Sequence, residues 1–217
     1  MAFLAGLSDY LAKNYEHSTF EDVASLATPC TLHLHGRITL KATITANKTY
    51  DIVVTTPDGA QRELHKTKIK MLHPAKHTDG VWKQLTIDES VRAQGLGPIL
   101  PAGQRNFIKN KSLFTLMREQ TPLTISLLEG EDLQGIIQSF SRYEITLVLQ
   151  GGEQVVILRH AVQNIRNIQG CCFLKSAQKS LRDWTKSALY IDPIPPSQLR
   201  PGLKKTKIKR RQKIIIR

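Results

Sequence analysis

The feature that most constrains the fold of this chain is a succession of short strand-forming runs, separated by turn residues. Between Leu123 and Ile165, these runs cover residues 123–128, 133–140, 143–149 and 154–158. The turns between them include Glu129-Gly130 and Gly151-Gly152. Strands this short, joined by tight turns, are typical of a small antiparallel barrel or a strongly bent sheet.

A helix is expected immediately ahead of these strands. Leu113 and Leu116 belong to an apolar stripe at helical spacing, and Pro122 ends the pattern. Asn110 can cap this helix, which would cover residues 112–120. The second half of the chain therefore predicts one helix followed by about five strands.

The same order of elements occurs earlier in the chain. Ser18 or Thr19 can cap a first helix that Pro29 ends. Strand-like runs then follow at residues 30–35, 38–46, 50–55, 61–65 and 69–72. Each half also contains a Tyr-acidic-Ile segment, Tyr50-Asp51-Ile52 in the first and Tyr143-Glu144-Ile145 in the second. The sequence thus predicts an internal duplication whose first copy has diverged.

The predicted organisation has six parts. They are an N-terminal extension (1–17), a diverged first copy (18–73), a linker rich in glycine and proline (74–106), the second copy (107–168), a possible helix (169–192) and a proline-rich, then basic tail (193–217).

The formal net charge of +13 favours a polyanionic partner such as nucleic acid or an anionic membrane surface. From Arg200 to Arg217 there are nine basic residues and no acidic one, so only +4 remains for the rest of the chain. The basic run contains Lys204, Lys205, Lys207, Lys209, Arg210 and Arg211. It can bind phosphates in a salt-sensitive, sequence-independent way, or it can simply be a solvated charged tail.

Other classes of protein find little support in the sequence. No apolar stretch reaches the roughly 18 to 20 residues of a membrane span, so we predict a cytoplasmic protein without a membrane partner. The three cysteines form neither a disulfide framework nor a zinc-type pair. Because paired carboxylates, a nucleophile elbow and a phosphate loop are missing from the sequence, we predict no enzymatic activity, catalytic residue, metal or cofactor.

Three motifs in the second half occur in a specific order. They are Arg118-Glu119 before Pro122, the spaced pattern Gly130…Leu133-Gln134-Gly135…Ser139-Phe140, and Arg159-His160-Ala161-Val162. Together they resemble the two Sm motifs of the Hfq family of bacterial RNA chaperones. The resemblance implies a mainly β protein with two Sm-like small barrels. Each barrel would be an N-terminal helix followed by a strongly bent five-stranded antiparallel sheet, with a basic C-terminal tail after the second.

The resemblance also implies an RNA site at the pore of a ring. Phe140 would stack on uridine bases, while Arg159 and His160 would contact base and phosphate. Further expected RNA-binding residues nearby are Arg142, Tyr143 and Lys109. In the first half Lys66 aligns with Arg159, and Asn47 takes the place of Phe140. A ring built from both copies would then alternate stacking and non-stacking pockets.

Two further RNA-binding surfaces of the family are matched only in part by this sequence. On the face that reads adenine-rich RNA, Gln134 matches, but Ser126 replaces an aromatic residue and Glu131 adds an anion. We therefore expect A-rich binding to be reduced or absent. On the lateral rim, where the family places several arginines, Arg118 is the residue expected to contact RNA.

The predicted function is non-enzymatic RNA binding, as an RNA chaperone or post-transcriptional regulator that prefers U-rich single-stranded RNA. A tandem chain would reach the family's six-membered geometry as a homo-oligomer, a trimer forming a pseudo-hexameric ring. The alternative is a structural or assembly protein that uses the Sm-like ring for protein interactions, with nonspecific nucleic-acid binding by the tail. Alanine at Phe140 and His160 would weaken oligo-U binding in the first case only. Whether the first copy contacts RNA is left open.

Overall fold

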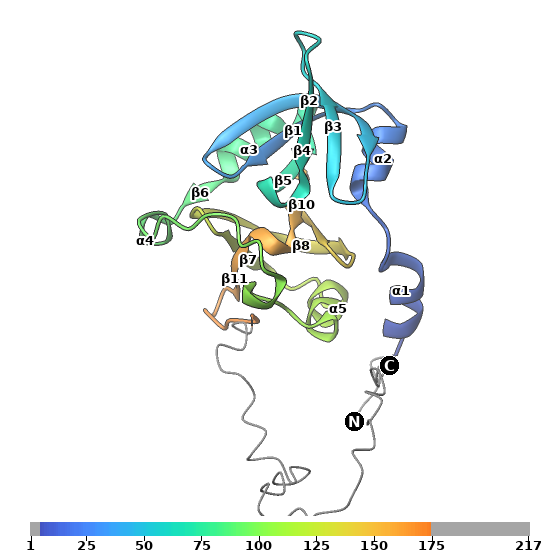
Figure 1. Cartoon of the computed structure of the whole chain (residues 1–217). Coiled ribbons are helices and arrows are strands. Elements are labelled where there is room, and N and C mark those ends of the chain that lie inside the picture. The colour runs from blue at the N-terminus through green and yellow to red at the C-terminus, as the bar shows by residue number, and fades with distance from the viewer. Residues whose placement is uncertain (1–4, 175–217) are drawn as a thin grey trace, which may run out of the picture. The chain divides into compact units, whose positions relative to one another are not determined.

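A computed structural model describes residues 5–174, and these residues are mainly β, as predicted. Their strands form a single antiparallel sheet with the order β11-β7-β8-β9-β10-β5-β1-β2-β3-β4, to which β6 adds by pairing with β8 (Figure 1). The described helices include none that is long and apolar enough to cross a membrane.

The first half of the chain contains one helix and five strands. They are α2 (Thr19–Ser25), β1 (Pro29–Leu34), β2 (Ile38–Asn47), β3 (Asp51–Thr55), β4 (Gln61–His65) and β5 (Ile69–Pro74). Their inward side chains, among them Phe20, Leu32 and Ile52, form one hydrophobic core that is closed to solvent. The fifth strand pairs with the first, so the sheet curls back upon itself.

The second half repeats this order. It contains α5 (Asn110–Arg118), β7 (Leu123–Leu127), β8 (Glu131–Phe140), β9 (Glu144–Leu149), β10 (Gln154–Leu158) and β11 (Val162–Asn167). A second core includes Leu113, Ile125 and Leu147. Asn110 is the first residue of α5 and not its cap, because its side-chain oxygen accepts from Arg159 instead.

The strand registers of the two halves agree. Adding 93 to each number converts the pair Asn47↔Ile52 into Phe140↔Ile145. The same shift carries the bulge between Ile44 and Ala46 onto the bulge between Ile137 and Ser139. It also carries the 3-10 turn η1 (Lys66–Lys68) onto η4 (Arg159–Ala161). Matching bulges and turns support the internal duplication inferred from the sequence.

The two halves meet along one strand pair, β5 with β10. The pair is antiparallel, with Val156 opposite Leu72 and Ile157 opposite Met71. Beside it, the buried Lys70 ammonium lies against the carboxylates of Glu129 and Glu131. Since β5 is the fifth strand of its half and β10 the fourth of the other, the strands at the two ends of the sheet are a fourth strand, β4, and a fifth strand, β11.

The prediction that residues 74–106 form a plain linker is wrong. They contain η2 (Ala75–His77), α3 (Thr78–Gln84), β6 (Thr86–Ile87), α4 (Glu89–Arg92) and η3 (Ala102–Gln104). These elements are held to the halves, since the Trp82 ring of α3 lies tilted against the His33 ring, with centroids 5.3 Å apart. The N-terminal extension likewise contains α1 (Leu7–Asn14), and most of the expected helix at 169–192 and all of the tail lie outside the described residues.

Candidate nucleic-acid interface

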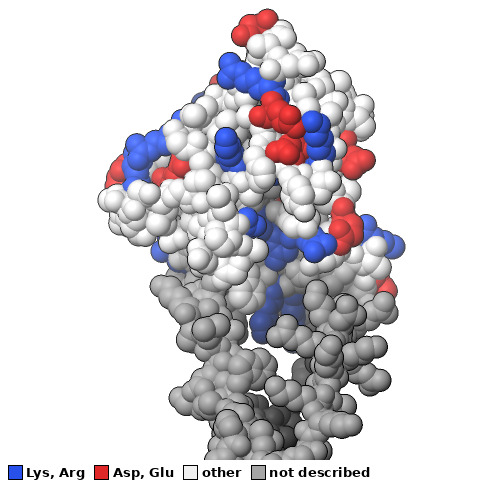
Figure 2. Space-filling view, in the orientation of Figure 1, with Lys and Arg blue, Asp and Glu red and all other residues white. Residues whose placement is uncertain are grey.

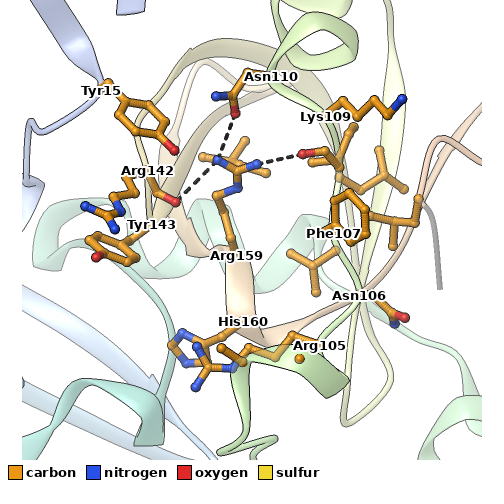
Figure 3. A pocket seen from close by; sticks show the side chains of 17 residues that line it. Tyr15, Arg105, Asn106, Phe107, Lys109, Asn110, Arg142, Tyr143, Arg159 and His160 are labelled. Atoms are coloured by element: carbon orange, nitrogen blue, oxygen red, sulfur yellow. Dashed lines mark hydrogen bonds between the residues drawn. The ribbon is translucent and has the colours of Figure 1, made fainter. Parts of the chain in front are cut away.

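A pocket of about 750 Å³ opens in the second half, between the end of the segment 102–110 and the loops that follow β8 and β10. Five residues predicted from the sequence line it together, namely Lys109, Arg142, Tyr143, Arg159 and His160 (Figure 3). The fold therefore brings together side chains that are up to 51 positions apart in the sequence, from Lys109 to His160.

Phe140 is not part of this pocket, and the prediction that it would be open to a base is wrong. Only 2% of the residue is exposed, and its ring lies 4.8 Å from that of Tyr10. The Tyr10 hydroxyl accepts from the Phe140 amide and donates to its carbonyl. Phe140 is the last residue of β8 on the inward face, so it completes the core instead of facing the solvent.

The exposed aromatic residue of this motif is Tyr143, three positions later. It is 60% exposed, and the guanidinium carbon of Arg142 lies 5.2 Å from the centroid of its ring. Across the pocket lies Phe107, which is 49% exposed and was not predicted (Figure 3). The signal that could have indicated it is a large aromatic residue in a segment otherwise rich in glycine and polar residues.

Arg159 lies at the back of the pocket and holds its walls together. Its guanidinium donates to the carbonyls of Ile108, Ser141 and Arg142, at 2.8, 3.0 and 3.3 Å, and to the Asn110 side chain. Burial lowers the pKa of this guanidinium from its ordinary value. Because these N–H groups already donate within the protein, Arg159 mainly fixes the loops around Tyr143. It has few donors left to bind a phosphate.

The Nε2 atom of His160 is buried and has no hydrogen-bond partner among the described residues. Desolvation by burial, followed by the nearby charge of Arg105, lowers the pKa of His160 to about 4. The ring is therefore neutral at pH 7. A neutral imidazole carries one donor and one acceptor nitrogen, which suits the edge of a base better than it suits a phosphate.

The first half repeats the backbone contacts that surround Arg159. The Lys66 ammonium donates to the carbonyls of Lys48 and Thr49, the equivalents of Ser141 and Arg142. The Lys66 amide donates to the Tyr50 carbonyl at 2.8 Å, as the Arg159 amide donates to that of Tyr143. Tyr50 is 69% exposed. An exposed tyrosine thus occurs in both halves, and the expected alternation based on Asn47 does not describe the exposed aromatics.

The remaining predicted residues lie away from the pocket. Gln134 is exposed on β8 beside a different hollow, and the Arg118 guanidinium donates to the Ala5 carbonyl at 3.2 Å. The basic residues predicted in the tail, from Lys204 to Arg211, lie outside the described part of the chain.

Part of the face expected to be weak for A-rich RNA, around Ser126, Gly130 and Glu131, is covered by other parts of the chain. Ser126 is completely buried, and Glu131 is engaged by Lys70. A Cβ placed on Gly130 would lie 2.6 Å from the Asp88 carbonyl oxygen, because β6 and α4 run directly over this turn. The left-handed φ of +91° at Gly130 is the tight turn predicted from the sequence.

Charge alone does not mark this pocket. Over residues 5–174 there are 18 lysines and arginines against 16 acidic residues, so the described part is nearly neutral. Figure 2 shows basic and acidic side chains interspersed over the visible face. The features that set the pocket apart are its exposed aromatics and its unpartnered histidine nitrogen.

Comparison with known proteins identifies the same region. The sequence model of the family described as Hfq protein matches residues 108–170. The RNA-binding protein Hfq of Halalkalibacterium halodurans is 32% identical over 65 residues, which are 29% of this chain and 82% of that protein. The RNA-binding protein Hfq of Moorella thermoacetica is 36% identical over 53 residues, 24% of this chain and 62% of that one. A crystal structure of the pleiotropic translational regulator Hfq, 28% identical, covers 26% of this chain and 92% of its own, with a TM-score of 0.25.

Proposed function

Since this chain belongs to the Hfq family, we propose that it is a non-enzymatic RNA-binding protein that holds single-stranded, U-rich RNA in the Tyr143 pocket. It would act as an RNA chaperone or a post-transcriptional regulator. The observation that carries the proposal is an exposed tyrosine beside a neutral histidine in the region that matches the family.

The pocket has the chemistry that a single-stranded base requires. Tyr143 offers a flat face, and stacking of a base on an aromatic ring contributes about 1–3 kcal/mol. Phe107 is a second exposed ring in the same pocket. Because every base has a π face, preference for uridine must come from hydrogen bonds. His160 lines the same pocket and is the candidate residue for such a hydrogen bond.

Lys109 and Arg142 supply positive charge at the rim of the pocket for the RNA backbone. The basic tail would add affinity that depends on salt and not on sequence, as expected for contacts with phosphates. The pocket would then select the nucleotide, while the tail would raise the overall affinity.

We also propose that residues 18–73 and 107–168 are two Sm-like domains and that three chains close into a pseudo-hexameric ring. Support comes from the β5–β10 pair, in which the fifth strand of one half meets the fourth strand of the other. The two strands at the ends of the sheet are likewise a fourth strand, β4, and a fifth strand, β11. Pairing them between chains would remove both open edges.

The proposal is tested by oligo-U binding to Tyr143→Ala, measured by fluorescence anisotropy at a salt concentration that suppresses contacts of the tail. Loss of one stacking ring should weaken binding roughly 5- to 150-fold, the equivalent of about 1–3 kcal/mol. Trp82→Ala is the matched control, since Trp82 is 47% exposed but lies on α3, outside the pocket.

Equal binding by Tyr143→Ala and the parent protein would contradict a role for the pocket. In that case the chain would instead be an assembly protein whose tail binds nucleic acid nonspecifically. Phe140→Leu provides a further comparison, because it changes the core under the pocket and leaves the exposed ring in place.

A further inference from the structure

The outer edge of β11 is already occupied by the residues that follow it in the chain. The chain turns back after Asn167, and Cys172 forms an isolated antiparallel β-bridge, a backbone pairing, with Arg166. The Phe173 amide donates to the Ile165 carbonyl at 2.9 Å, and the Asn167 amide donates to the Cys171 carbonyl at 3.2 Å. Residues 171–174, called the edge segment below, thus act as a short extra strand.

The edge segment is also packed against the core. Phe173 and Leu174 are half-buried and contact the hydrophobic cluster of the second half. Leu174 lines the Tyr143 pocket together with Val162 and Ile165. The edge segment therefore covers apolar surface as well as backbone groups of β11.

The equivalent edge of the first half shows what else can bind there. On β5, Leu72 and Met71 pair with Val156 and Ile157 of β10. The shift of 93 residues converts Leu72 and Met71 into Ile165 and Asn164 of β11. The edge segment therefore overlaps this position at Ile165, whose carbonyl already accepts from the Phe173 amide.

A strand suited to this edge is exposed at the other end of the sheet. By the same shift, β4 is the equivalent of β10, with Glu63 and Leu64 in the places of Val156 and Ile157. Among the described strands, β4 pairs only with β3, and four of its five residues are exposed. Acidic Asp51 lies opposite His65 at one end of β4, and Lys109 lines a pocket together with Val162 and Ile165 of β11.

We propose that the β11 edge is a strand-docking site with two competing occupants, the chain's own edge segment and β4 of a second copy. In the docked state Glu63 and Leu64 of the second copy lie opposite Ile165 and Asn164. Both occupants need the Ile165 carbonyl and the same side of β11, so the edge segment must leave before the copies join. This inference rests on the proposed ring. It adds that the edge segment regulates whether the ring can close.

The test locks the edge segment onto β11 in the full-length chain. Arg166 and Cys172 lie opposite each other as a non-hydrogen-bonded antiparallel pair. The backbone hydrogen bonds on either side are made by their neighbours, Asn167 with Cys171 and Phe173 with Ile165. Such pairs have Cα atoms about 4.5 Å apart, within the span of a disulfide. Arg166→Cys would therefore form a disulfide with Cys172, in a Cys171→Ser background that prevents exchange between neighbouring thiols.

Sedimentation velocity of this variant with and without dithiothreitol compares two states of one protein. We expect the oxidised form to remain monomeric and the reduced form to associate into trimers. Circular dichroism of both forms checks that the fold is the same, so a loss of association reports on the edge and not on misfolding.

A second variant releases the edge segment. Phe173→Pro removes the amide that donates to Ile165, and we expect the copies to associate about tenfold more tightly because the free edge becomes more populated. Cys172→Pro is the control, since the Cys172 amide points away from β11 and its loss should leave association near that of the parent.

The possible results separate the two proposals. If the oxidised, reduced and Phe173→Pro proteins form trimers equally well, the competition is overturned and the ring stands. If Phe173→Pro remains monomeric at every concentration, the ring itself is overturned, and the docking site with it.

Discussion

Phe140 and Tyr143 are only three positions apart, but only the Tyr143 ring is exposed in the pocket. Both residues are aromatic and lie in one Sm-like motif, but Phe140 ends a strand on its inward face whereas Tyr143 follows in the turn. The sequence motif located the region correctly. It could not tell which ring is exposed, because that depends on where β8 ends and on Tyr10, which is 130 residues away.

Arg159 is predicted to be a structural residue of the pocket. Arg159→Ala leaves the carbonyls of Ile108, Ser141 and Arg142 without this donor, which should lower the free energy of unfolding by about 2–4 kcal/mol. Arg159→Lys should lose less, because Lys66 makes the two corresponding loop contacts in the first half. Urea denaturation measures both, and equal losses for alanine and lysine would contradict this role.

His160 is predicted to make stability depend on pH. Its pKa is about 4 in the folded protein and about 6.5 in an unfolded chain, so the unfolded state binds the proton first. The free energy of unfolding should therefore be unaffected above pH 6.5 and fall as the pH drops toward 4. At pH 5 the loss from this residue is about 2 kcal/mol. His160→Gln should remove that part of the difference between pH 7 and pH 5, and an unchanged difference would refute the assignment.

Among the elements, β8 contains a glycine, Gly135, where the neighbouring strand β9 approaches closely. A Cβ on Gly135 would lie 2.3 Å from the Val148 carbonyl oxygen on the neighbouring strand. The equivalent residue of the first half is Ala42, so the two sheets cannot bend identically.

Gly135→Ala should accordingly lower the free energy of unfolding by about 1–3 kcal/mol, since a backbone atom and not a flexible side chain must move. Gly103→Ala is the control, because a Cβ there meets no atom within 4 Å. Thermal denaturation of both variants provides the measurement. A Gly135→Ala protein as stable as the parent would show that the strand has room for the methyl group.

The elements between the halves were the least predictable part of the fold. Residues 74–106 are rich in glycine and proline, and their helices and strand are seven residues long or shorter, too short for a periodic pattern. Their order comes from contacts with distant residues, such as that of Trp82 with His33 and the pairing of β6 with β8.

The position of β6 and α4 over Gly130 predicts poor binding of adenine-rich RNA. Because β6 and α4 run over Gly130 and Ser126 is buried, these two positions offer an adenine no open surface in the described structure. We expect oligo-A to compete at least tenfold less well than oligo-U in the anisotropy assay, at the salt concentration that suppresses the tail. Equal competition by the two oligomers would contradict this expectation.

For the whole molecule, the sequence predicted the repeated order of helix and strands but not how the halves join. Registers within each half follow from local turns, such as that of Gly130. The β5–β10 pair and the ion cluster of Lys70 link residues that are 59 or more positions apart, and no local pattern indicates such a pairing.

The account depends above all on RNA binding at the Tyr143 pocket. Ultraviolet crosslinking of the full-length protein to oligo-U, followed by mass spectrometry of the linked peptides, tests it most directly. We predict crosslinked nucleotides on peptides that contain Tyr143 and Phe107, with the Phe140 ring itself unmodified because it is buried. Crosslinks confined to the basic tail, with none at the pocket, would contradict the account.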